Sequence, residues 1–590
     1  MPPSMATIAA ERRRLMLGCH TYGNRRTISR GEELAVRYRG KYNAFWLKST
    51  LPNPTGEGNS CLSKKKAMHD YVIIGPGSKG CVIVSRLTED PNTTVLLLEA
   101  GGPDDREEIH IPAAWPQLLK TEFDWEYYTE PQPHLNNRSL FWPRGKMLGG
   151  TSSHNAMVYI RGNRYIFDLW AEAGNEGWEY EDILPLFKKS QNQERGASEY
   201  HGVGGPLNIA DQRDTNPLSC AFVDACVENG FTRNDDFNGP AQEGVGYYQV
   251  TQKDGRRCSA STAFLRPAMG RPNLTIETNA MVTRLRFEGT RVVGVSYTLN
   301  GEEKEVDANT EVILSGGAIN SPQLLLLSGV GPADQLEALD VPVVVDLPGV
   351  GQNLQDHLLV VLNYECTDPI SLATANSAAA LLEYQHFRKG PLSSNAAEAG
   401  GYVKTRPDLP LPDMQMFFVP TYFMEHGFVQ PEGHGFAFVT SLQVPESRGS
   451  VSLRSRNHLE HPLIQPNYLE SEADMQVLVE GVKIMRPLAQ TKAFAPFVGE
   501  EVEPGIHVQS DEEIREFIRN KAETVYHPVG TCKMGVDSMA VVDSELRVHG
   551  IQGLRVADAS VMPIITNGNT NAPSIMIGEK AADIIRGASA

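Results

Sequence analysis

The sequence predicts an α/β protein with more than one packing layer, because of its length, its composition and one strand–turn–helix–strand segment. The chain has 590 residues, of which 41% are hydrophobic and 21% are charged, as is ordinary for a globular protein. A chain this long buries most of its apolar surface without needing a disulfide or a metal. No run of about 18 apolar residues occurs, so no transmembrane segment is expected. Disordered, collagen-like and disulfide-scaffold classes are excluded.

The basic residues are concentrated at the N-terminus. Residues 1–66 carry 13 Lys and Arg against four Asp and Glu, whereas the whole chain has a net charge of −18. We expect residues 1–67 to be a dispensable extension, either a disordered tail or an over-long reading frame that truly starts at Met68. An organelle presequence is the remaining alternative, although Glu11, Glu32 and Glu33 depart from the acid-poor composition of such segments. The expected location is cytoplasmic, or organellar if the extension is a presequence.

Net charge and cysteine spacing exclude several partners. An excess of acidic residues argues against a nucleic-acid or anionic-membrane partner. The eight cysteines contain no C-x-x-C pair. We therefore expect buried or reduced thiols and no metal site.

The segment 70–99 predicts a dinucleotide site. Residues 71–74 (YVII) form an apolar run typical of a buried parallel strand, which leads into GPGSKG at 75–80. Gly75 allows a tight turn, Gly77 and the adjoining Ser78 lie where a pyrophosphate approaches, and Gly80 lets the next helix pack closely. The helix N-terminus offers free N–H groups to phosphate. A second apolar run, 95–98, ends at Glu99, whose carboxylate can accept ribose hydroxyls. This order is typical of a Rossmann-type domain that holds NAD or FAD.

Lys79 is unusual in this turn, because it places a cation beside the positive end of a helix. Two interpretations stay open: its side chain contacts phosphate, or it points to water.

Four further motifs decide between the dinucleotides. They read WPRGKMLGGTSSHNAMVYIRGN from 142, GGAINSPQLLLLSGVGP from 316, YHPVGTCKMG from 526, and VVDSELRVHGIQGLRVADASVMPIITNGNTNAPSIMIGEKAADII from 541. With them the chain resembles the glucose–methanol–choline (GMC) oxidoreductases, which oxidise alcohols with FAD, and within them the choline dehydrogenase-like branch. The resemblance runs from about residue 68 to the C-terminus.

The resemblance implies which residues contact FAD. The pyrophosphate and ribose contacts match the glycines and Glu99 named above. The resemblance also covers the loop beside the flavin ring, one strand residue at the adenine, and a late turn along the ribityl chain. The loop residues are Gly149, Gly150, Thr151, Ser152 and Asn155, the strand residue is Val282, and the turn residues are Asp558 and Ala559.

His154 departs from the commonest family pattern, which has an aliphatic residue there. A histidine at this place resembles the version in which the imidazole is bonded to the flavin 8α carbon. Covalent attachment and simple packing near the ring both remain open.

The resemblance also implies the catalytic pair. Alcohol oxidation by a flavin removes the hydroxyl proton and transfers a hydride to flavin N5, so a group must accept or stabilise that proton. His527 matches the family's catalytic histidine, with titration expected near neutral pH. Asn571 matches the second polar group that binds the substrate oxygen.

The predicted organisation is a discontinuous FAD-binding domain, 68–165, 255–355 and 510–590, with insertions 166–254 and 356–509 that build a substrate domain. The resemblance implies that the substrate domain is a mainly antiparallel sheet flanked by helices.

The expected activity is oxidation of a small-molecule alcohol to the aldehyde, with choline one candidate among aliphatic, aromatic and polyol alcohols. The alternatives on the same fold are a non-redox hydroxynitrile lyase and a fatty acid photodecarboxylase; the latter branch lacks the His and Asn pair that this chain keeps. The electron acceptor, oxygen or a quinone or other carrier, and the state, monomer or homo-oligomer, stay open.

Overall fold

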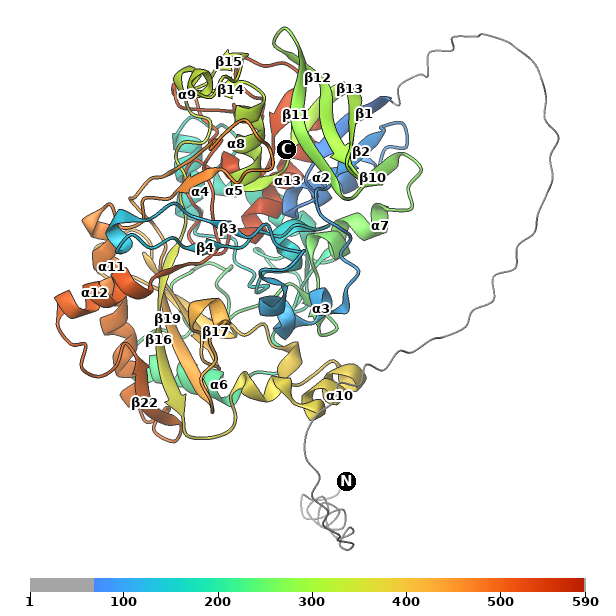
Figure 1. The fold of residues 1–590 in the computed structure, drawn as a ribbon. Helices are drawn as coiled ribbons and strands as arrows, with labels where there is room; N and C mark the ends of the chain where they lie inside the picture. The colour runs from blue at the N-terminus through green and yellow to red at the C-terminus, as the bar shows by residue number, and fades with distance from the viewer. Residues whose placement is uncertain (1–67, 588–590) are drawn as a thin grey trace, which may run out of the picture. The chain divides into compact units, whose positions relative to one another are not determined.

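The computed structural model describes residues 68–587, so the expectations for residues 1–67 lie outside the described residues. Within this part the chain forms two seven-stranded sheets with helices packed on them (Figure 1). The expected α/β class is therefore confirmed, with one mainly parallel and one antiparallel sheet.

The first sheet has the strand order β10-β2-β1-β13-β12-β11, with β24 beside β13. Its parallel part joins β1 (Met68–Ile74), β2 (Val95–Leu98), β10 (Leu274–Glu277), β24 (Leu554–Val556) and the end of the long β13 (Glu302–Leu314). The first half of β13 forms an antiparallel meander with β11 (Ala280–Glu288) and β12 (Arg291–Leu299). All four residues of β2 are buried, as expected for a strand covered on both faces.

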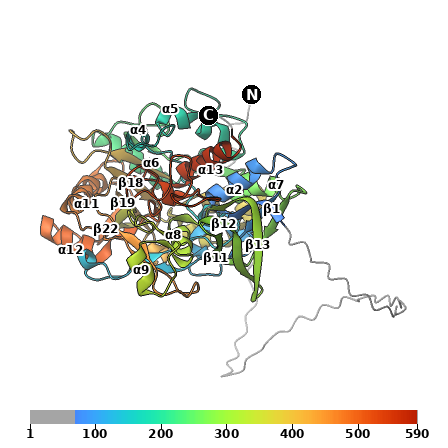
Figure 2. The same ribbon diagram turned by 90° about the horizontal axis from the view of Figure 1, so that it is seen from above.

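Two helices pack against each other beside this sheet (Figure 2). Helix α2 (Ser78–Leu87) follows β1, and α13 (Asn571–Ile585) is the last helix of the described chain. Gly578 makes the contact close, since a Cβ there would lie 3.0 Å from the carbonyl oxygen of Lys79. An ion pair adds to this packing, because Arg86 Nη2, near the end of α2, lies 2.8 Å from Oε1 of the buried Glu579, which follows Gly578 in α13. This packing fixes the start of α13 beside the start of α2.

The second sheet has the order β22-β16-β19-β18-β17-β7, with β23 beside β16. Its strands are β7 (Gly244–Tyr247), β16 (Leu358–Cys366), β17 (Ala399–Val403), β18 (Met414–Val419), β19 (Gly435–Leu442), β22 (Val498–Glu503) and β23 (Glu523–Thr524), and its pairs are antiparallel. Apolar residues fill both faces, so the sequence shows no clean alternation. One face packs with helices, and the other includes Leu359, Phe417 and Val439.

The remaining helices and strands flank these sheets. They are α3 (Glu107–His110), α4 (Arg164–Glu172), α5 (Tyr180–Ser190), α6 (Pro217–Glu228), α7 (Arg266–Ala268), α8 (Gly317–Leu327), α9 (Ala333–Ala338), α10 (Ala378–Phe387), α11 (Glu472–Met485), α12 (Asp511–Lys521), and the short pairs β3 (Tyr127–Tyr128) with β4 (Phe141–Trp142), β5 (Gln191–Gln193) with β6 (Leu207–Ile209), β8 (Gln252–Lys253) with β9 (Arg256–Arg257), β14 (Val330–Gly331) with β15 (Val345–Asp346), and β20 (Ser450–Ser452) with β21 (Leu463–Gln465). None of the helices within residues 68–587 combines the length and apolar composition needed to cross a bilayer.

The strand membership bears on the expected domains. Strands β7, β16–β19 and β22 come from the two predicted insertions. Strand β23 and helix α12 fall in the predicted third FAD segment, yet β23 pairs with β16 and α12 packs with the second sheet's core. Apolar residues Ile514, Phe517 and Ile518 explain this, because they need the helical side of that sheet. The domain boundaries themselves remain predictions.

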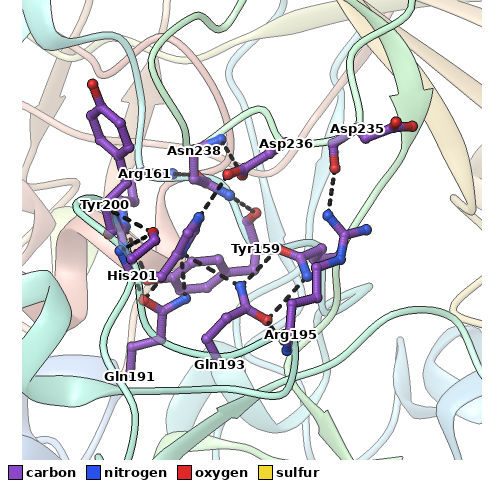
Figure 3. A network of polar contacts seen from close by, with 12 residues as sticks. Tyr159, Arg161, Gln191, Gln193, Arg195, Tyr200, His201, Asp235, Asp236 and Asn238 are labelled. Atoms are coloured by element: carbon purple, nitrogen blue, oxygen red, sulfur yellow. Dashed lines mark hydrogen bonds and ion pairs between the residues drawn. The ribbon is translucent and has the colours of Figure 1, made fainter.

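A buried polar network holds the segment 157–161 in place (Figure 3). The Arg161 guanidinium donates to the carbonyl oxygen of Tyr200 and to Gln191 Oε1, both at 2.6 Å. His201 Nε2 lies 2.7 Å from Asp236 Oδ2, and Asn238 Nδ2 donates to the Tyr159 carbonyl at 3.1 Å. Every charged group in it has a partner, as burial requires. The network thus fixes a segment that also forms the wall of the cavity described next.

Candidate active site

A large cavity is lined by residues of both sheets. Twelve of the residues selected from the sequence line it, namely Gly75, Gly77, Ser78, Glu99, Gly150, Thr151, His154, Asn155, Val282, His527, Ala559 and Asn571. The structure therefore brings together segments that lie up to about 500 positions apart. The other four selected residues, Gly80, Gly149, Ser152 and Asp558, do not line the cavity.

The turn between β1 and α2 needs its glycines for geometric reasons. Gly75 has φ of +89°, and a Cβ there would lie 2.8 Å from the carbonyl oxygen of Ser315. A Cβ on Gly80 would lie 2.1 Å from the Gly75 carbonyl oxygen. The turn is consequently tight, and the N-terminal N–H groups of α2 are free to bind phosphate.

The selected residues that do not line the cavity support its wall. Gly149 N donates to the Pro76 carbonyl at 2.8 Å, and Ser152 Oγ donates to the Gly149 carbonyl at 2.6 Å. The Asp558 carboxylate accepts bonds from Gly317 N and Ser321 Oγ, and from Ser560 N and Oγ. These four bonds occupy the Asp558 oxygens and join the end of β24 to α8. Of the two residues selected in this turn, Ala559 is the one that lines the cavity.

Lys79 lies in the cavity wall and is only 8% exposed, which does not support the interpretation that it points to water. Burial lowers its pKa to about 8, although Asp558 opposes the shift. Within residues 68–587 its ammonium group has no hydrogen-bonding or ion-pair partner. A buried cation is costly unless an anion accompanies it. A dinucleotide diphosphate at the start of α2 would supply that anion.

The end of β2, at the same edge of the first sheet as the glycine turn, suits an adenosine. Glu99 is buried at the end of β2 and accepts a bond from Gly101 N at 2.7 Å. Burial raises its pKa to about 8, so this carboxyl gains from hydroxyl donors such as those of a ribose. Val282 lies nearby in the cavity wall, on β11.

His154 lines the cavity and has one ring nitrogen without a hydrogen-bonding partner. It is buried, and its Nε2 has no hydrogen-bonding partner within the described residues. Burial, with the charges of Arg144 and Arg257, lowers its pKa to about 3, so the imidazole is neutral. A neutral nitrogen with a free lone pair fits attachment to a flavin ring, whereas a protonated one does not.

A second histidine orients His527. His357 Nε2 lies 3.1 Å from the carbonyl oxygen of Gln443, which can only accept, so Nε2 carries the proton. Burial lowers the pKa of His357 to about 3, so its Nδ1 is an acceptor. His527 Nδ1 lies 3.0 Å from that atom and must donate to it. The lone pair of His527 is thereby assigned to Nε2, the nitrogen that a substrate hydroxyl needs.

The backbone of His527 is held by a buried carboxylate. Asp356 accepts a bond from His527 N at 2.7 Å and further bonds from Thr524 and Tyr468. Tyr526 has a φ of +68°, a backbone conformation that residues other than glycine rarely adopt. The Arg144 guanidinium donates to the Tyr526 carbonyl and so stabilises this conformation.

The two asparagines of the late motif have different partners. Asn569 Nδ2 lies 3.3 Å from His527 Nε2. Asn571 Oδ1 accepts a bond from Ser78 Oγ at 2.7 Å, which links α13 to the phosphate turn. Both line the cavity, and the contact with His527 is made by Asn569. The sequence analysis selected Asn571 but not Asn569, Asp356 or His357. For the last two the available signal was the Asp–His pair that follows the NLQ sequence at 353–355.

The expectation that His527 titrates near neutral pH is wrong in this structure. Burial, the adjacent His357 and the charge of Arg144 lower its pKa well below the ordinary value. His527 is therefore already neutral at pH 7 and able to accept a proton. Its protonation would affect activity only in acid.

Comparisons with known proteins agree with this geometry. Two family models described as GMC oxidoreductase match residues 69–359 and 445–578. Mitochondrial choline dehydrogenase of Mus musculus is 46% identical over 556 residues, 92% of this chain and 93% of the relative. Alcohol dehydrogenase [acceptor] of Pseudomonas putida is 47% identical over 527 residues, 88% and 96% of the two chains.

Solved structures show the same fold. Pyridoxine 4-oxidase from Mesorbium loti superimposes with a TM-score of 0.82 at 33% identity, covering 88% of this chain and all of that one. A variant formate oxidase from Aspergillus oryzae RIB40, studied for modification of its FAD, gives a TM-score of 0.83 at 29% identity, with coverage of 88% and 98%.

Lys79 provides a first prediction. We expect Lys79→Met to weaken FAD binding about 10-fold or more, because a charge-assisted bond to phosphate is lost. Lys79→Arg keeps the charge and should bind FAD more tightly than the Met variant. Release of FAD on dilution is followed by flavin fluorescence in a His154→Ala background, where no histidyl bond can form. Riboflavin, which lacks the diphosphate, should bind the Met and Arg variants equally. If these two variants also bound FAD with equal affinity, Lys79 would not be a phosphate contact.

His154 provides a second prediction. We expect the flavin to stay with acid-precipitated native protein, because His154 lines the cavity and its Nε2 has no partner within the described residues. In His154→Ala the colour should pass into the supernatant while the fold is kept, as circular dichroism would verify. Native protein that loses all its flavin to the supernatant would exclude the covalent bond.

Proposed function

Since this chain belongs to the GMC oxidoreductase family and oxidises alcohols with FAD, we propose that His527 accepts the hydroxyl proton of the substrate. The observation that carries this proposal is the chain of bonds from Gln443 through His357, which leaves the His527 lone pair on Nε2. Bound FAD supplies the hydride acceptor, flavin N5. The relatives named above are dehydrogenases and oxidases, so the lyase and photodecarboxylase alternatives gain no support.

The substrate hydroxyl would bind between His527 and the two asparagines. Its O–H group donates to His527 Nε2 and replaces the long bond from Asn569 there. An asparagine amide then donates to the substrate oxygen and stabilises the negative charge that develops as the proton leaves. Asn571 is held by Ser78 and Asn569 lies beside His527, so both amides are pre-organised.

The cofactor contacts follow from the same wall. We assign the diphosphate to the turn 75–80 with Lys79, the ribose to Glu99, the adenine to the backbone at Val282, and the flavin ring to the loop 150–155. The names of the relatives give choline or an unspecified alcohol as the substrates of those proteins. For this chain we propose the substrate class alone, a small-molecule alcohol.

Removing the base should leave cofactor binding intact. We expect His527→Ala to bind FAD with an ordinary oxidised spectrum but to be reduced by alcohol about 10²–10⁴-fold more slowly, as a lost general base predicts. Asn571→Ala should slow the same step, and the double variant should cost less than the two effects combined. Anaerobic stopped-flow bleaching of the flavin measures these rates.

The pH profile gives the control. Because the His527 pKa is lowered, the native reduction rate should stay flat through neutral pH and fall only as acid protonates Nε2. The Ala variant should lack that acid limb. A variant that bleaches its flavin at the native rate would contradict the role of His527.

A further inference from the structure

The charge of the substrate end of the cavity is set by few residues. Among the cavity-lining residues within 68–587, the charged side chains are Lys79, Glu99 and Arg144. Glu99 belongs to the first sheet, where β2 ends beside β10 and β11. His527, in contrast, follows β23 of the second sheet. The cavity around His527 therefore contains one cation, the half-buried Arg144, and no lining carboxylate.

The acids of the second sheet near His527 face other groups. Asp356 lies behind the His527 backbone and its oxygens accept bonds from Thr524, Tyr468 and His527 N. Glu523 accepts a bond from His426 N, and burial raises its pKa to about 7. Neither of these carboxyl groups lines the cavity.

The remaining wall near His527 is apolar. It is formed by the inner face of the second sheet and by neighbouring loops, with Leu359 on β16, Phe417 and Val419 on β18, Val439 on β19, and Val525 before His527. Trp115 and Phe423 add aromatic surface. Such a wall favours an apolar chain, because it offers no polar partner.

We infer that the substrate is an uncharged alcohol with an apolar aliphatic or aromatic chain, and that a quaternary ammonium alcohol is a poor substrate. This inference rests on the proposed alcohol oxidation at His527. A cation bound here would lose its water and find no carboxylate in the wall, and Arg144, which interacts with Asp356 and Asp124 on its other side, adds a like charge. Aromatic rings such as Trp115 and Phe423 attract cations, but only enough to offset a small part of that loss.

The test compares two alcohols of the same shape. Choline and 3,3-dimethylbutan-1-ol differ by the exchange of the ammonium nitrogen for carbon, and benzyl alcohol and 1-hexanol extend the set. We expect the holoenzyme to show a kcat/KM for the neutral isostere about 10²-fold or more above that for choline. Equal or better oxidation of choline overturns the inference and leaves the alcohol oxidation standing. If none of these alcohols bleaches the flavin anaerobically, the proposed function itself fails and the inference falls with it.

A matched pair of variants adds a second readout. Leu359→Glu places a carboxylate on the apolar wall, and Leu359→Gln is its uncharged control. The Glu variant should shift the preference toward choline by tenfold or more relative to the Gln variant. Identical preferences in the two variants would contradict the electrostatic explanation; the native comparison stands by itself if either variant fails to fold.

Discussion

The hydrogen-bond chain from Gln443 through His357 to His527 is the constraint on which the rest of the active site depends. Its first donor follows from antiparallel pairing, because β16 begins after His357 and β19 ends before Gln443, with Leu359 opposite Ser441. The sheet thus fixes the proton on His357 Nε2. The tautomer of His527, and with it the position of the base, follows from the register of two strands rather than from any residue that touches substrate.

Desolvation is the second physical effect that shapes the cavity. Burial keeps His154, His357 and His527 neutral, and the cation of Arg144 reinforces this at His154 and His527. The same burial leaves Lys79 without an anion. A cavity with the buried Lys79 ammonium group and few lining acids matches a cofactor that carries a diphosphate, and it disfavours a substrate that carries a positive charge.

The sequence predicted the features that are encoded locally. The glycine turn, the short buried strands and Glu99 lie within 30 residues of one another, so strand and turn chemistry sufficed. The family motifs added His154 and His527, which the structure brings to one cavity. His357 was not selected, because its role comes from a bond across 170 residues. Nor could the pKa of His527 be predicted, since burial and neighbouring charges exist only in the folded chain.

The orientation of His527 is tested most directly by replacing His357. Asparagine can keep an acceptor near the position of Nδ1, whereas leucine, of similar size, removes it. Stopped-flow flavin reduction by an alcohol should fall about 10²-fold or more in His357→Leu, and His357→Asn should recover most of the native rate, with equal FAD content in both. If the flavin reduction rate falls equally in both variants, or does not fall in the leucine variant, the hydrogen-bond chain does not orient His527 and the central claim is contradicted.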